Sequence, residues 1–146
     1  MLLKLTSPPW LIAYGFLLTF PACGMAQTAS HHLKPQPGNS KLNFHKDIQP
    51  IFDANCVVCH QTGGTQGGLN LEDGESYGAT VMRNSEESKL LRIAPGRPKE
   101  SYLIHKLEGS HIEAGGTGEQ MPTTGPLDKG SIQILRRWIQ EGARKD

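Results

Sequence analysis

Two cysteines and a histidine stand within five consecutive residues, Cys56-Val57-Val58-Cys59-His60. In an exported chain, C-x-x-C-H is typical of covalent haem attachment, because two thiols on one helical turn can each add to a vinyl group of the porphyrin. The imidazole of His60 is then held where it can bind the iron. We therefore expect one covalent haem c, attached through Cys56 and Cys59 and ligated by His60.

Two other kinds of site share part of this pattern. A structural zinc site needs four cysteine or histidine ligands, and the only further cysteine is Cys23. His105 and His111 could complete a Cys2His2 set, but His60 would then have no role. A thioredoxin-like dithiol expects a strand–helix–strand context, which the sequence does not show. Both kinds of site remain alternatives to haem.

A six-coordinate iron needs a second axial ligand, and Met121 is the strongest candidate. It follows a glycine-rich loop and precedes Pro122, which restricts the backbone and has no N–H to satisfy. Histidine–methionine ligation raises the reduction potential of the iron. The alternatives are that Met121 only fills the core, that Met82, His105 or His111 binds instead, or that the sixth position is open.

The first 26 residues have the features of a secretory signal peptide. Lys4 precedes an apolar run, Leu11–Phe20, and small residues lead to an expected cut after Ala26. The run is shorter than the roughly 20 apolar residues that span a bilayer. A permanent anchor or lipidation at Cys23 is the alternative. Because haem is attached covalently outside the cytoplasm, export to a bacterial periplasm agrees with the haem motif.

The rest of the chain is long enough for one domain. Residues 27–42 are polar and predict a flexible leader, and residues 43–146 are expected to form a monohaem cytochrome domain. Without Lys4, 14 acidic residues balance as many basic ones. Such a balanced surface has no basic field with which to hold nucleic acid, so we expect no nucleic-acid partner.

Apolar residues at helical spacing predict several short helices joined by long loops rich in glycine and proline. The first helix is expected to begin near Asp47 and to end in Cys56. The last is expected to run from an Asp128 cap to about Glu141, with Gly142 ending it. Its buried stripe is expected to comprise Ile132, Leu135, Trp138 and Ile139. Between these helices we expect a weak helical turn over 75–82 and a helix over 99–107.

A series of short motifs also occurs in a characteristic order. They are Phe44, Ile48-Gln49-Pro50-Ile51, the C-x-x-C-H motif, Gly67-Gly68-Leu69-Asn70-Leu71, Pro95-Gly96, Ser101-Tyr102-Leu103-Ile104, Met121-Pro122, Leu127, Leu135-Arg136-Arg137-Trp138-Ile139 and Gly142-Ala143. Together they resemble the Planctomycete-type cytochrome c domain, a short relative of the class I cytochromes c. The resemblance covers about Asn43 to Ala143. It implies an all-α fold of short helices around one haem, the first and last packed together, with Met121 as distal ligand.

These observations predict a periplasmic electron-transfer protein that docks with redox protein partners, and not an enzyme. The alternatives are a haem-c subunit of a larger oxidoreductase, or an enzyme or gas sensor with an open sixth coordination position. A methionine bound to the iron favours electron transfer, because both axial ligands stay in place while the iron changes oxidation state.

Overall fold

The computed structural model describes residues 40–64 and 66–146, and the structural statements below concern these residues. The predicted signal peptide, its cleavage site and most of the predicted leader lie outside them. The described chain is helical, as expected. It contains no β-strand in that part, only three isolated β-bridges. The elements are η1 (Phe44–Ile48), α1 (Gln49–Asn55), η2 (Gln66–Gly68), α2 (Ser76–Thr80), η3 (Pro98–Glu100), α3 (Tyr102–Glu108) and α4 (Lys129–Gln140).

The first helix begins three residues earlier than predicted, with the π-helical turn η1. Asn43 caps this turn, because its side chain accepts a 3.0 Å hydrogen bond from the backbone N–H of Lys46. Pro50 is the second residue of α1, and its position had suggested a later start. A proline is tolerated there because the N–H groups in the first turn of a helix have no partner within that helix.

The last helix agrees closely with the prediction. Asp128 caps α4 by accepting a 2.9 Å hydrogen bond from the backbone N–H of Ser131. Gly142, at a φ of 102°, follows the end of the helix. Leu135, Trp138 and Ile139 are buried, whereas Ile132 is only half-buried. None of the helices in the described ranges has the length and apolar character needed to traverse a bilayer.

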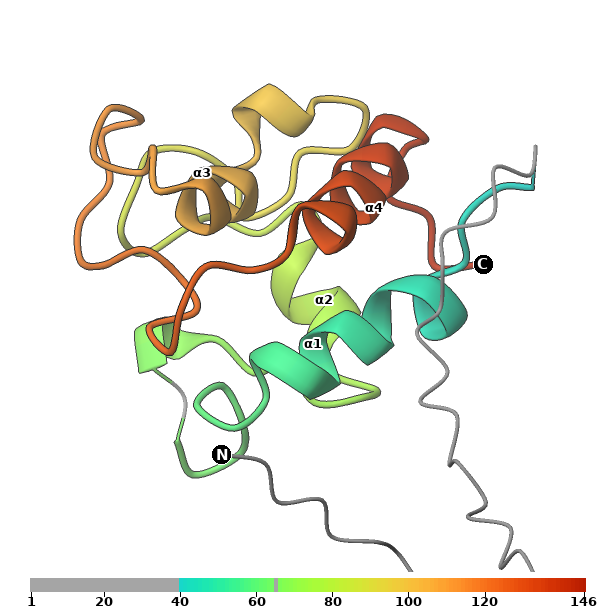
Figure 1. Cartoon of the computed structure of the whole chain (residues 1–146), viewed down its shortest axis with the longest axis horizontal. Helices are drawn as coiled ribbons and strands as arrows, with labels where there is room; N and C mark the ends of the chain where they lie inside the picture. The colour runs from blue at the N-terminus through green and yellow to red at the C-terminus, as the bar shows by residue number, and fades with distance from the viewer. Residues whose placement is uncertain (1–39, 65) are drawn as a thin grey trace, which may run out of the picture. The chain divides into compact units, whose positions relative to one another are not determined.

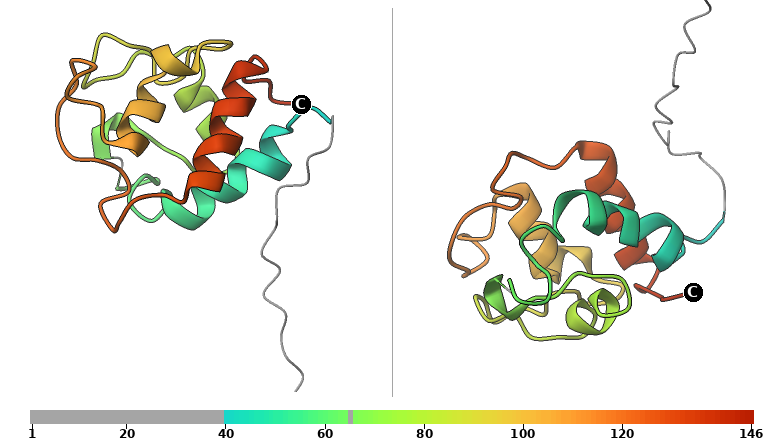
Figure 2. Two further views of the ribbon diagram at one scale, coloured as in Figure 1. Left: turned by 45° about the horizontal axis from the view of Figure 1, so that its top comes forward. Right: turned by 90° about the horizontal axis from the view of Figure 1, so that it is seen from below.

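The core lies between η1 and α4, which pack against each other (Figure 1). The Phe44 ring meets the Trp138 ring at a centroid distance of 5.4 Å and the Tyr77 ring at 5.2 Å. The first and last helical segments therefore pack together, as the family resemblance implied, and the contact between them is an aromatic cluster. Figure 2 shows the same arrangement from two further directions, with α3 beside α4.

Candidate functional site

The C-x-x-C-H motif forms a tight turn directly after α1. The backbone N–H of Cys56 donates to the carbonyl of Phe52 at 2.8 Å. The N–H groups of Cys59 and His60 both donate to the carbonyl of Cys56, at 3.1 and 3.0 Å. The motif thus continues the winding of α1, although the helix itself ends at Asn55, one residue before the predicted end. This winding brings both thiols and the imidazole to the wall of one cavity.

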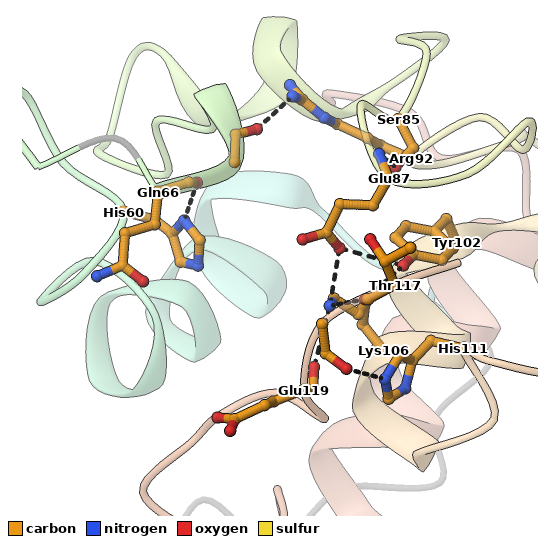
Figure 3. A network of polar contacts seen from close by, with 12 residues as sticks. His60, Gln66, Ser85, Glu87, Arg92, Tyr102, Lys106, His111, Thr117 and Glu119 are labelled. Atoms are coloured by element: carbon orange, nitrogen blue, oxygen red, sulfur yellow. Dashed lines mark hydrogen bonds and ion pairs between the residues drawn. The ribbon is translucent and has the colours of Figure 1, made fainter.

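The orientation of the His60 ring is set by a backbone carbonyl. Nδ1 of His60 lies 3.0 Å from the carbonyl oxygen of Gln66 in η2 (Figure 3). A carbonyl can only accept, so Nδ1 carries the proton and donates to it. The Nε2 atom is then the nitrogen with the lone pair. Histidine ligands of metals almost always donate their second ring N–H to a carboxylate, a backbone carbonyl or a water, which selects the tautomer that binds.

The two thiols are both free and half-buried. Burial, and secondarily the charge of Cys59, raises the pKa of Cys56 to about 11. The Cys56 thiol is therefore protonated at neutral pH. Redox-active C-x-x-C pairs contain a cysteine of lowered pKa, so this shift is opposite to the one that a thioredoxin-like site requires.

A cavity of about 300 Å³ lies beside the motif. This volume is at the lower end of the range for ligand pockets. One part of its lining is aliphatic and consists of Val58, Leu69, Leu71, Leu103 and Leu107. Another part carries charged and hydroxyl groups, including Glu87, Arg92, Tyr102 and Lys106. The cavity can therefore hold a largely apolar ligand with a polar edge.

Met121 lines the same cavity as His60, Cys56 and Cys59. Its backbone N–H donates a 2.9 Å hydrogen bond to the carbonyl of Lys106 in α3. The neighbouring Gln120 side chain donates to the carbonyl of Leu107, also at 2.9 Å. The loop that carries Met121 is thus fastened along one end of α3. The structure brings together all four residues that the sequence singled out.

The two other candidate histidines, His105 and His111, lie outside the cavity that the cysteines line. His105 contacts Ser110 Oγ at 2.8 Å and the carbonyl of Lys99 at 2.9 Å through its two ring nitrogens. His111 is 5% exposed, and its Nε2 lies 2.9 Å from the carbonyl of Gly118. Neither ring lines the cavity. Nowhere in 40–64 or 66–146 do three histidine, cysteine or acidic side chains gather as a metal site.

The sequence did not indicate that charged and hydroxyl groups line part of the cavity. Lys106 is only 8% exposed, although a lysine in a helix is usually a surface residue. One signal was present: Lys106 follows the buried Tyr102 by four residues, so the two share a helix face. Glu87 and Arg92 belong to an irregular segment, whose course no periodicity predicts.

Comparisons with known proteins find little. No family model matches the chain, and no curated protein matches it. Among solved structures, the chain is similar to hydrazine synthase from Kuenenia stuttgartiensis, with 22% identity and a TM-score of 0.48. The alignment covers 70% of this chain but only 16% of that one. The resemblance to the Planctomycete-type cytochrome c domain therefore stays a prediction.

One expectation from the sequence is corrected by this comparison. The sequence led us to expect an electron carrier and not an enzyme, whereas the similar solved structure is an enzyme, a synthase. The likeness is too distant to assign any activity to this chain. It nevertheless contradicts the expectation that the chain is not an enzyme.

Proposed function

We propose that this domain binds one haem c covalently and transfers electrons through it, with His60 and Met121 as axial ligands. The observation that carries the proposal is the hydrogen bond from His60 Nδ1 to the carbonyl of Gln66 at 3.0 Å. It selects the tautomer whose Nε2 can bind iron, within the turn that also holds both thiols. No other histidine in the described ranges lines the cavity with them.

The residues around the cavity fit this group. The aliphatic side chains suit the flat apolar face of a porphyrin, and both thiols are free, so each S–H can add across a vinyl group. Cys56 and Cys59 would hold the porphyrin, while His60 and Met121 would bind its metal. When bound, the iron would supply one-electron chemistry by changing between its ferric and ferrous states.

The same residues account for stable ligation during electron transfer. Two thioether bonds would keep the cofactor in place through repeated encounters with partners. The turn after α1 holds His60, and α3 holds the loop of Met121. With both axial ligands held by the chain, little would need to rearrange when the charge on the iron changes. Such a site serves equally in a free carrier and in a domain of a larger oxidoreductase.

We further propose that the protein acts in the periplasm with redox protein partners. Val58, between the two cysteines, is 72% exposed although it is aliphatic. It would offer a partner an apolar contact beside the attachment site. The balanced charge of residues 27–146 predicts docking that depends only weakly on salt.

The test is to export the full chain in a host with haem-attachment machinery and to measure the mass and spectrum of the purified protein. We expect the mass of one added haem, which is lost when Cys56 and Cys59 are both changed to alanine. His60→Ala should alter the ferric spectrum. His105→Ala is the matched control, because that ring is engaged by Ser110 and Lys99, and it should leave the spectrum unchanged. A purified protein without haem would overturn the proposal.

Carbon monoxide tests the ligation separately. If Met121 holds the sixth position, the ferrous protein should bind carbon monoxide weakly and slowly. Rapid, tight binding would instead indicate an open position, and it would reject Met121 as ligand while leaving haem attachment in place.

A further inference from the structure

The ammonium group of Lys106 is buried and fully hydrogen-bonded. Its side chain is 10% exposed. Nζ lies 2.7 Å from Glu87 Oε2, 2.9 Å from the carbonyl of Thr117 and 3.0 Å from the carbonyl of Glu119 (Figure 3). An ammonium group has three N–H donors, and these three acceptors occupy all of them. A buried cation with every donor satisfied holds its partners in one geometry.

Glu87 supplies the charge that makes this burial tolerable. Burial by itself would raise the pKa of Glu87, but the hydrogen bond and charge of Lys106, the hydrogen bond from Tyr102 and the charge of His111 together lower it. Tyr102 Oη donates to Glu87 Oε2 at 3.1 Å. The carboxylate is therefore ionised opposite the ammonium group, and the two charges neutralise each other at the edge of the cavity.

Lys106 holds the loop before Met121 at three successive points. Its side chain binds the carbonyls of Thr117 and Glu119, and its own backbone carbonyl accepts the 2.9 Å hydrogen bond from the N–H of Met121. The points of contact are two residues apart along the loop. One lysine thus sets the path of the chain up to Met121.

The glycines of this loop show how closely it approaches the ion pair. Gly118 has a φ of 75°, and a Cβ there would lie 3.2 Å from Lys106 Nζ and 3.4 Å from Glu87 Oε1. A Cβ on Gly116 would overlap the ring of Tyr102. These positions lack side chains because the loop backbone packs directly on the residues that hold it.

We propose that Lys106, with Glu87 as its counter-ion, is the positioning residue that keeps Met121 at the iron. This inference rests on the proposed ligation by His60 and Met121. Lys106 would not bind the iron; it would lower the entropy that the loop loses when the thioether binds. A ligand held in place has a higher effective concentration at its site than one on a free loop, so it competes better with external ligands.

The experiment titrates the ferric haem protein with imidazole, at a pH where imidazole is neutral and insensitive to the charge of Lys106. Four proteins are compared: the unchanged chain, Lys106→Met, Met121→Ala and the double variant. Lys106→Met keeps the apolar stem and removes the ammonium group. We expect it to raise the apparent affinity for imidazole at least about tenfold, because it removes both charged hydrogen bonds from Nζ to the loop carbonyls. Met121→Ala should raise the affinity further.

The double variant separates positioning from other effects. If Lys106 acts through Met121, adding Lys106→Met to Met121→Ala changes the affinity no further. If Lys106→Met raises the affinity for imidazole equally in the unchanged chain and in Met121→Ala, the inference is overturned, because Lys106 would then only restrict entry to the cavity. If the affinity for imidazole rises clearly in Met121→Ala but not in Lys106→Met, the inference is overturned, while the proposed ligation by Met121 stands. No rise in Met121→Ala would reject the ligation itself, and the inference with it.

Lys99→Met is the matched control, because Lys99 is an exposed lysine close by in η3. It should bind imidazole as the unchanged chain does. If Lys106→Met does not yield folded protein, Glu87→Gln takes its place and should raise the affinity only when Met121 is present. Glu119→Gln is its control, since Glu119 contacts Lys106 through the backbone. If Glu87→Gln and Glu119→Gln bind imidazole with equal affinity, the inference is overturned.

Discussion

The rings of Phe44 and Trp138 lie with their centroids 5.4 Å apart and join the first helical turn of the domain to its last helix. Both side chains are almost completely buried, at 1% and 0% exposure. Residues at opposite ends of the described chain thus share one contact. The turn with the two thiols directly follows the helix that this contact anchors.

Replacing Phe44 by alanine should destabilise the domain by about 3–5 kcal/mol, because the deletion leaves a cavity among the rings of Phe52, Tyr77 and Trp138. Chemical denaturation followed by circular dichroism measures this loss. The control is Ile112→Ala, whose side chain is 58% exposed and does not line the cavity, and which should cost less than about 0.5 kcal/mol. A similar small loss for both variants would show that the aromatic cluster does not anchor the fold.

Gln49→Leu should destabilise the domain by about 2 kcal/mol. Gln49 is 3% exposed, donates a 2.9 Å hydrogen bond to the carbonyl of Leu71 and accepts one from the hydroxyl of Ser76. The leucine would leave both groups buried without a partner. In a double-mutant cycle, adding Ser76→Ala to Gln49→Leu should cost less than Ser76→Ala alone. Strict additivity would argue against the coupling.

Asp128→Ala should cost about 1 kcal/mol, because it removes the cap of α4. Asp128→Asn keeps an acceptor and should cost much less. The hydrogen bonds from Ser131 lower the pKa of Asp128. The ionised cap therefore contributes stability above its ordinary pKa near 3.8, and this contribution is lost as the pH falls through the folded-state pKa. Unfolding curves across acidic pH should show a shallower decline in Asp128→Asn than in the unchanged chain.

Glu87 should make stability depend on pH in the same direction. Its pKa is lowered despite burial, chiefly by Lys106. The Glu87 carboxylate therefore stabilises the fold above its ordinary pKa of 4.5, and protonation removes this effect as the pH falls through the lower folded-state value. Glu87→Gln should be less stable than the unchanged chain at neutral pH and should lose less stability on acidification. If the stability of Glu87→Gln and of the unchanged chain fell in parallel as the pH was lowered, this would contradict the ion pair.

Met121→Ala should lower the reduction potential of the haem protein by on the order of 100 mV. A thioether ligand favours the ferrous state, and for one electron each tenfold change in relative affinity corresponds to about 59 mV. Spectroelectrochemical titration measures the change. Met82→Ala is the control, since Met82 is 62% exposed and does not line the cavity. An unchanged potential in Met121→Ala would reject Met121 as ligand.

The structural features formed by residues close together in the sequence were largely predictable. The spacing of Cys56, Cys59 and His60 indicates one site by itself, because residues within one turn cannot lie far apart. The cap at Asp128 and the buried stripe of Leu135, Trp138 and Ile139 follow from helix periodicity in the same way. The start of the first helix was predicted three residues too late, because a π turn precedes Pro50 and no propensity rule indicates such a turn.

The residues far apart in the chain depended on the tertiary structure. Met121 could be named as a candidate, but only the folded chain shows that it lines the cavity of His60 and that Lys106 holds its loop. The pairing of Lys106 with Glu87 could not be inferred, because it joins a helix to an irregular segment. Local sequence determines turns and helix faces through short-range sterics and hydrogen bonds. Which charges meet inside is decided by the packing of distant segments, because burial then requires each charge to have a partner.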